Sequence, residues 1–106
     1  MALIRTDLTA PTGTQVTIAV QANNTELNSA EYPPGTSVAL AADKSITFNV
    51  IAGRHSLVIN FDIASLPPFA EQVNIVEIDP ANPSSPIVID SFFGVQTGRI
   101  LRILGT

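Results

Sequence analysis

The chain contains no cysteine and no tryptophan, and it has only one histidine and one tyrosine among its 106 residues. Without cysteine, neither disulfide bonds nor thiolate metal sites can form, so the fold must be stabilised by burial of apolar side chains. The same absence makes the chain compatible with oxidising and reducing compartments alike. The scarcity of aromatic rings also leaves little on which a sugar ring can stack.

Charged residues are scarce as well, at 13% of the chain, whereas globular proteins average about 25%. Nine acidic and five basic residues give a net charge of −4, which argues against a nucleic-acid surface, because such surfaces gather Lys and Arg. No apolar run approaches the roughly 20 residues of a membrane span, and the first residues lack the pattern of a signal peptide. We therefore expect no nucleic-acid partner and no membrane insertion, and the compartment stays open.

Proline is absent from every run of alternating apolar and polar residues, although the chain contains eight prolines. Because proline cannot donate a hydrogen bond within a sheet, this distribution separates strands from turns. The alternation predicts strands at residues 15–22, 36–42, 45–51, 56–63, 72–78, 87–93 and 99–104. Between them, residues 25–31 are predicted as a loop, residues 36–51 as a hairpin and residues 66–69 as an extended crossover. The first nine residues are a candidate for an eighth strand.

These strands follow one another at intervals of about 8 to 12 residues, and no helical periodicity interrupts them. We expect a single all-β domain over residues 1–106, folded as an antiparallel β-sandwich of about seven to eight strands. The immunoglobulin-like and jelly-roll types both fit this pattern. A closed barrel is the alternative.

The last three predicted strands differ from the earlier ones, because they carry large apolar side chains on both faces. A two-layer sandwich buries only one face of each sheet, so the second face needs a cover. One explanation is a central position under loops or under the N-terminal segment. The explanation we favour is a homo-oligomer. Its predicted contact residues are Val76, Ile78, Val88, Phe92, Ile100 and Leu104.

No grouping of residues indicates a catalytic site. His55 follows a turn at Gly53 without a cysteine or a locally spaced carboxylate beside it, and a surface position explains it. The Gly-x-Ser-x-Gly motif of hydrolases is absent. The glycines at 94 and 98 lack the lysine and the helix of a phosphate-binding loop. We therefore predict that the protein is not an enzyme.

Two polar groups are candidates for ligand binding. The first consists of Glu77, Asp79, Asn82 and Asp90. These are oxygen ligands of the type that calcium prefers, but their spacing matches no calcium loop, and turn formation also explains them. The second group consists of Asn23, Asn24, Glu26, Asn28 and Tyr32, which suit hydrogen bonding to sugar hydroxyls. Calcium is the one cofactor for which the sequence offers ligands.

Arginine is the last residue type that the sequence singles out. Arg99 and Arg102 flank two apolar residues and suit pairing with an acid across a strand or subunit boundary. The leading hypothesis is a non-enzymatic structural or interaction module that self-associates or docks to a protein. The alternative is a carbohydrate- or glycan-binding module, with or without calcium, that uses its polar loops.

Overall fold

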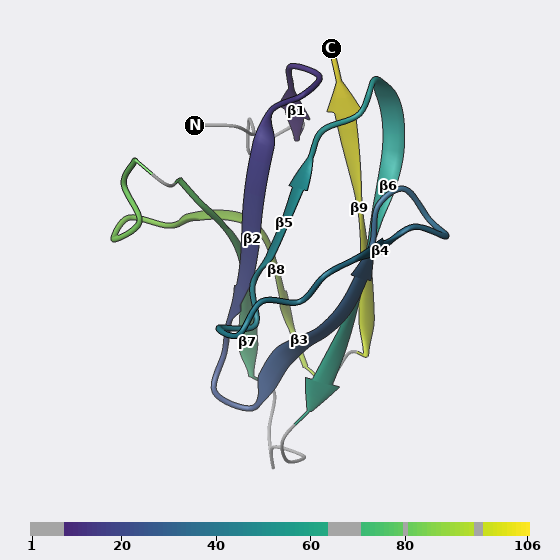
Figure 1. The fold of residues 1–106 in the computed structure, drawn as a ribbon. Coiled ribbons are helices and arrows are strands. Elements are labelled where there is room, and N and C mark those ends of the chain that lie inside the picture. The colour runs from purple at the N-terminus through teal and green to yellow at the C-terminus, as the bar shows by residue number, and fades with distance from the viewer. Residues whose placement is uncertain (1–7, 64–70, 80, 95–96) are drawn as a thin grey trace.

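The computed structural model describes residues 8–63, 71–79, 81–94 and 97–106, which form two β-sheets packed face to face (Figure 1). The strands are β1 Thr9–Ala10, β2 Gln15–Gln21, β3 Thr25–Glu31, β4 Ser37–Val38, β5 Ile46–Asn49, β6 Gly53–Ile63, β7 Gln72–Ile78, β8 Ile87–Phe93 and β9 Gly98–Gly105. The larger sheet has the order β1-β9-β6-β3-β4, and the smaller sheet has the order β5-β2-β7-β8. No helix long and apolar enough to cross a membrane occurs among the described residues.

The prediction of an all-β, sandwich-like fold is confirmed. The described residues form nine strands, which exceeds the expected seven to eight, and each of the two sheets has free ends and does not close into a barrel. Of the candidate eighth strand, the described residues include Thr9, which with Ala10 forms the two-residue β1, parallel to the end of β9. Residues 1–7 and the predicted crossover at residues 66–69 lie outside the described part of the chain.

The longest strand, β6, lies in the middle of the larger sheet and shows how the sequence sets the register. Leu57, Ile59 and Phe61 are buried, whereas Asn60 and Asp62 between and after them are exposed. A shift of one residue would bury these two polar side chains and expose the three apolar ones. Hydrophobic burial therefore fixes how β6 pairs with its neighbours β3 and β9.

One cluster of apolar side chains fills the space between the sheets. Ile18 of β2, Ile75 of β7 and Ile103 of β9 have no exposed surface. Two aromatic pairs extend this core, with ring centroids 4.7 Å apart for Tyr32 and Phe48 and 5.6 Å apart for Phe61 and Phe92. Among the described residues, every buried side-chain nitrogen or oxygen atom has a hydrogen-bond partner.

The prediction of a loop at residues 25–31 is wrong, because these residues form β3. A bulge at Asn28 separates the pairs Leu27–Phe61 and Ser29–Asn60, so Leu27 and Ala30 both point inward although they are three residues apart. The bulge breaks the period of two by which a strand is recognised. Polar residues on the exposed face further hide the strand.

The predicted hairpin at residues 36–51 is also wrong. Its first half contributes only β4, which joins the larger sheet beside β3, and its second half contributes β5, which joins the smaller sheet beside β2. The two halves meet at a single bridge between Leu40 and Ile46. The chain therefore crosses from one sheet to the other at this point.

Gly105, at the end of β9, lies against the segment that links β5 to β6. A Cβ atom at this position would lie 1.9 Å from the carbonyl oxygen of Ile51 and 3.0 Å from Cγ1 of Val50. Because the first of these contacts is with backbone, it cannot be relieved by a side-chain rotation. Only glycine fits here.

We predict that Gly105→Ala lowers the free energy of unfolding by more than about 3 kcal/mol, since overpacking against backbone exceeds the usual cost of a tight core. Gly98→Ala in the same strand is the matched control, because its nearest contact, with the Ile59 carbonyl oxygen, would be 3.3 Å. Urea denaturation of the two variants measures the difference. Equal losses at positions 98 and 105 would contradict the close approach at Gly105.

Candidate binding site at the open edge of the sandwich

Strands β8 and β9 lie at the same side of the sandwich, where β8 ends the smaller sheet. On the outer side of β9, β1 pairs only with Leu104 and Gly105. The Leu104 N–H donates to the Leu8 carbonyl oxygen at 3.1 Å, and backbone groups two and four residues away along a strand point in the same direction. The backbone of Ile100 and Arg102 therefore faces away from β6, and no described strand pairs with it there.

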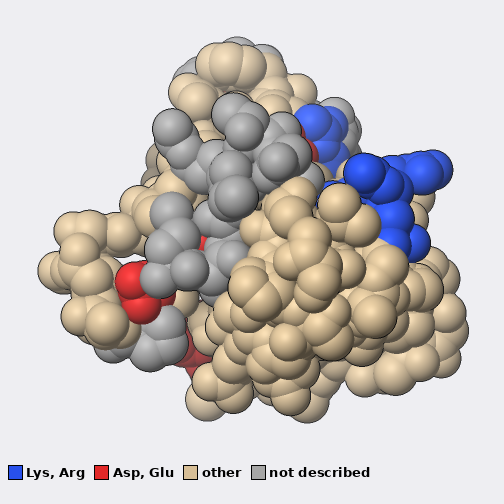
Figure 2. Space-filling model, turned by 90° about the horizontal axis from the view of Figure 1, so that it is seen from above, with Lys and Arg blue, Asp and Glu red and all other residues tan. Residues whose placement is uncertain are grey.

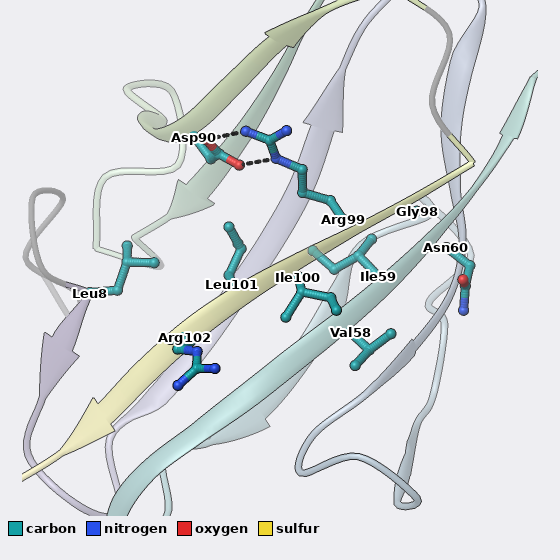
Figure 3. A pocket seen from close by; sticks show the side chains of 10 residues that line it. All are labelled: Leu8, Val58, Ile59, Asn60, Asp90, Gly98, Arg99, Ile100, Leu101 and Arg102. Atoms are coloured by element: carbon teal, nitrogen blue, oxygen red, sulfur yellow. Dashed lines mark hydrogen bonds and ion pairs between the residues drawn. The ribbon is translucent and has the colours of Figure 1, made fainter.

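A pocket of about 700 Å³ lies beside this part of β9 (Figure 3). Its lining residues are Leu8, Val58, Ile59, Asn60, Asp90, Gly98, Arg99, Ile100, Leu101 and Arg102. Val58 and Ile100 are opposite each other in the register of β6 and β9, on the face that points away from the core. Figure 3 shows their side chains next to each other. The pocket thus joins an apolar pair to a strand edge and to charged side chains.

Asp90 and Arg99 connect the two sheets at this edge. Arg99 donates from Nε to Oδ2 of Asp90 at 2.6 Å and from Nη2 to Oδ1 at 3.2 Å, so the pair is bidentate (Figure 3). The two side chains are 21% and 31% exposed for Asp90 and Arg99, respectively. These hydrogen bonds raise the pKa of Arg99 above its ordinary value, although partial burial acts in the opposite direction.

The guanidinium group of Arg99 also lies over an aromatic ring. Its Cζ atom is 5.0 Å from the ring centroid of Phe92, which in turn packs on Phe61 in the core. A cation over a ring face is attracted by the ring quadrupole. Asp90, Arg99 and Phe92 together close the space between β8 and β9 and set the position of the strand that carries Ile100.

The structure does not gather the candidate calcium ligands into one site. Asp90 is paired with Arg99, and Glu77 is buried on β7 opposite Ile18 of β2. Asp79 accepts a hydrogen bond from the Ala81 N–H at 2.9 Å, which lowers the pKa of its carboxyl group. Asn82 donates its N–H to the Asp79 carbonyl oxygen within the same turn. No group of three or more His, Asp or Glu residues in the described part of the chain is placed to hold a metal ion.

The candidate sugar-binding residues are likewise separated. Asn23 and Asn24 form the turn between β2 and β3, where both backbone N–H groups donate to the Glu71 carboxylate. Glu26 and Asn28 are exposed on β3. Tyr32 is 4% exposed, packs on Phe48 and accepts a hydrogen bond from the Ile51 N–H, so the expectation that its ring is available to a sugar is wrong.

The six residues predicted for an oligomer contact fall into three groups. Val88 and Ile100 are exposed, and Ile78 and Leu104 are half-buried. Val76 and Phe92 are 1% and 7% exposed within the single chain. Val76 is opposite Val88 and lies outside the core cluster, so it is on the outer face of its sheet but is covered within the chain. The expectation that Phe92 faces outward is wrong, because a bulge in β8 changes the alternation: Ile75 is opposite Asp90, whereas Val76 is opposite Val88.

His55 lies near the start of β6, away from the pocket. Its Nε2 atom is 3.0 Å from the Ala52 carbonyl oxygen, and its neighbour across the sheet is Ile103. Sequence reasoning missed the apolar pair Val58–Ile100, because Val58 belongs to a strand whose outer face is otherwise polar. Only the register of β6 against β9 brings the two side chains together.

Comparison of the chain with protein-family models, with curated proteins and with solved structures gives no match in any of the three. The site must therefore be interpreted from its own residues. Its apolar pair, its exposed arginine and a strand edge with which no described strand pairs are features that suit contact with another protein surface.

We predict that Asp90→Asn and Arg99→Met each lower the free energy of unfolding by about 1–2 kcal/mol, because each leaves a partly buried group without its charged partner. The double variant is expected to lose about 1 kcal/mol less than the sum of the single losses. Denaturation with guanidinium chloride measures all three, and Lys44→Met, at an exposed turn residue, controls for the loss of a positive charge. Additive losses would show that the pair contributes nothing as a pair.

Proposed function

We propose that the protein is a non-enzymatic β-sandwich module that acts by protein–protein association, and first of all by association with a second copy of itself. The observation that carries this proposal is the distribution of exposed apolar surface. Among the described residues, the large hydrophobic side chains that are exposed are Val88, Phe93 and Ile100, at 37%, 67% and 63%. All three lie on β8 and β9.

Isolated exposed apolar side chains are common on protein surfaces, and chance would distribute three of them over unrelated strands. Here they lie on two strands at the same edge of the sandwich, Val88 and Phe93 on the outer face of the smaller sheet and Ile100 on that of the larger sheet. Apolar surface concentrated at one edge is typical of a contact surface. The composition supports the same view, because only 13% of the residues are charged. Few charges reduce the electrostatic repulsion that keeps copies of a protein apart.

We predict that the wild-type protein sediments with the mass of an oligomer at high micromolar concentration, and that Ile100→Asp or Phe93→Asp lowers that mass. An ionised side chain at the centre of an apolar contact lacks both water and a partner. Whichever of these two residues lies in the contact, we expect its replacement by Asp to weaken association by about 100-fold, or roughly 2.7 kcal/mol. Analytical ultracentrifugation over a concentration series measures both effects.

Thr47→Asp on β5 is the matched control, because Thr47 is exposed on the smaller sheet and lies away from β8. It should leave the mass unchanged. Far-ultraviolet circular dichroism establishes that each variant is folded. A wild-type protein that remains monomeric at high micromolar concentration would overturn the proposed self-association.

A further inference from the structure

The outer face of the larger sheet, by which we mean the side chains of β3, β6 and β9 that point away from the core, has opposite charges at its two ends. Arg54 of β6 and Arg102 of β9 are exposed at the end where the chain terminates. Glu26 of β3 and Asp62 of β6 are exposed at the other end. The apolar pair Val58–Ile100 lies between the two ends, beside Glu31 of β3, which is opposite Val58 and whose carboxylate accepts a hydrogen bond from the Gly35 N–H at 2.7 Å.

The space-filling view shows the basic end of this face. Figure 2 looks down on the end where β9 finishes, and the Lys and Arg side chains in view gather on the side where β6 and β9 lie in Figure 1. Most of the Asp and Glu atoms visible from this direction lie on the other side. No residue is acidic from Arg54 back to the start of β6, or from Arg102 onward to the chain end.

Within β6 the charges are arranged symmetrically. Arg54 precedes Val58 by four residues and Asp62 follows it by four, so all three point to the same face. At about 3.3 Å per residue, the two charges lie about 13 Å on either side of Val58. When a second copy of β6 is placed antiparallel to the first, with the two Val58 residues opposite each other, each Arg54 lies opposite an Asp62.

Neither end finds its opposite charge within the described chain. Glu26 is directly opposite Asp62 in the register of β3 and β6, and such like-charge pairs destabilise a sheet. Arg54 is opposite Leu104, and Arg102 is opposite Ser56, so the two arginines are diagonal neighbours. No hydrogen bond or ion pair in the described structure involves these four charged side chains.

We propose that the outer face of the larger sheet is the contact surface of a two-fold symmetric homodimer, in which the β6 strands of the two copies cross near Val58 and run in opposite directions. The two-fold rotation places Arg54 of one copy over Asp62 of the other. It also brings Arg102 toward the acidic end of the second copy. This inference rests on the proposed self-association and adds its surface and its orientation.

The geometry of sheet packing supports this arrangement. Two sheets pack face to face at a separation of about 10 Å, which leaves room for Val58 and Ile100 from both copies at the centre. The contact is isologous, so each copy contributes both its basic and its acidic end. Charges placed at the rim set orientation and association rate, and salt weakens them.

The test exchanges the charges at each end. One variant, Arg54→Glu with Arg102→Glu, makes both ends of the outer face acidic, and a second variant, Glu26→Lys with Asp62→Lys, makes both ends basic; Glu31, opposite Val58, is unchanged in each. Each variant alone should dimerise at least about tenfold more weakly than the wild type, because like charges meet at both ends. An equimolar mixture should recover dimerisation, since an acidic face then meets a basic one. Sedimentation measures affinity, and native mass spectrometry identifies the heterodimer by its mass.

Lys44→Glu, in the exposed turn before β5, is the control for a change of net charge and should leave dimerisation unchanged. Thermal unfolding followed by circular dichroism shows whether each variant is folded, and recovery in the mixture proves that both are competent. A wild-type oligomer that is insensitive to all charge exchanges would overturn this orientation and leave the proposed self-association standing. An oligomer that is dissociated by Phe93→Asp and not by Ile100→Asp would also overturn the orientation and leave self-association standing. A monomeric wild type would overturn both the orientation and the self-association.

Discussion

The structure depends on one constraint: two sheets share a single apolar layer, and every strand can give only one face to it. Ile18, Ile59 and Ile75 meet in that layer without exposed surface. The opposite face of each strand is consequently left to solvent or to another molecule, and polar residues suit it. Val58 and Ile100 are two apolar side chains paired on an outer face. They are therefore informative about a contact with another molecule, whereas the same pair in the core would be ordinary.

The fold class and most strands could be predicted from the sequence. The period-two alternation over β2, β6, β7 and β9 does not depend on the order of the strands in the sheets. The errors occur where that period fails. Bulges near Asn28 and Ile89 place residues three apart on the same face, so β3 was missed and Phe92 was assigned to the wrong side. Tyr32 was misplaced for a different reason, since nothing local shows that its ring packs on Phe48.

The candidate site was predictable only in part. Sequence reasoning expected Arg99 to pair with an acid across a strand or subunit boundary, but the choice of Asp90 depends on which strands end opposite each other at the open edge. The Asp90–Arg99 pair has a consequence for the surface, because it holds β9 against β8 from the inner side. A rigid β9 presents Ile100 and Arg102 in a fixed position, which lowers the entropy lost when a partner binds.

The charges of the outer face also bear on how strong an association can be. Glu26 and Asp62 are opposite each other in the chain, and in the proposed dimer a second copy would relieve their repulsion by supplying an arginine. Exposed pairs contribute little, about 0–1 kcal/mol each, so the apolar centre must provide most of the affinity and the charges must provide the orientation. We therefore expect the proposed contact, with so few large apolar residues, to depend on protein concentration and on salt. That combination suits a module whose assembly is reversible and is decided by how many copies are brought together.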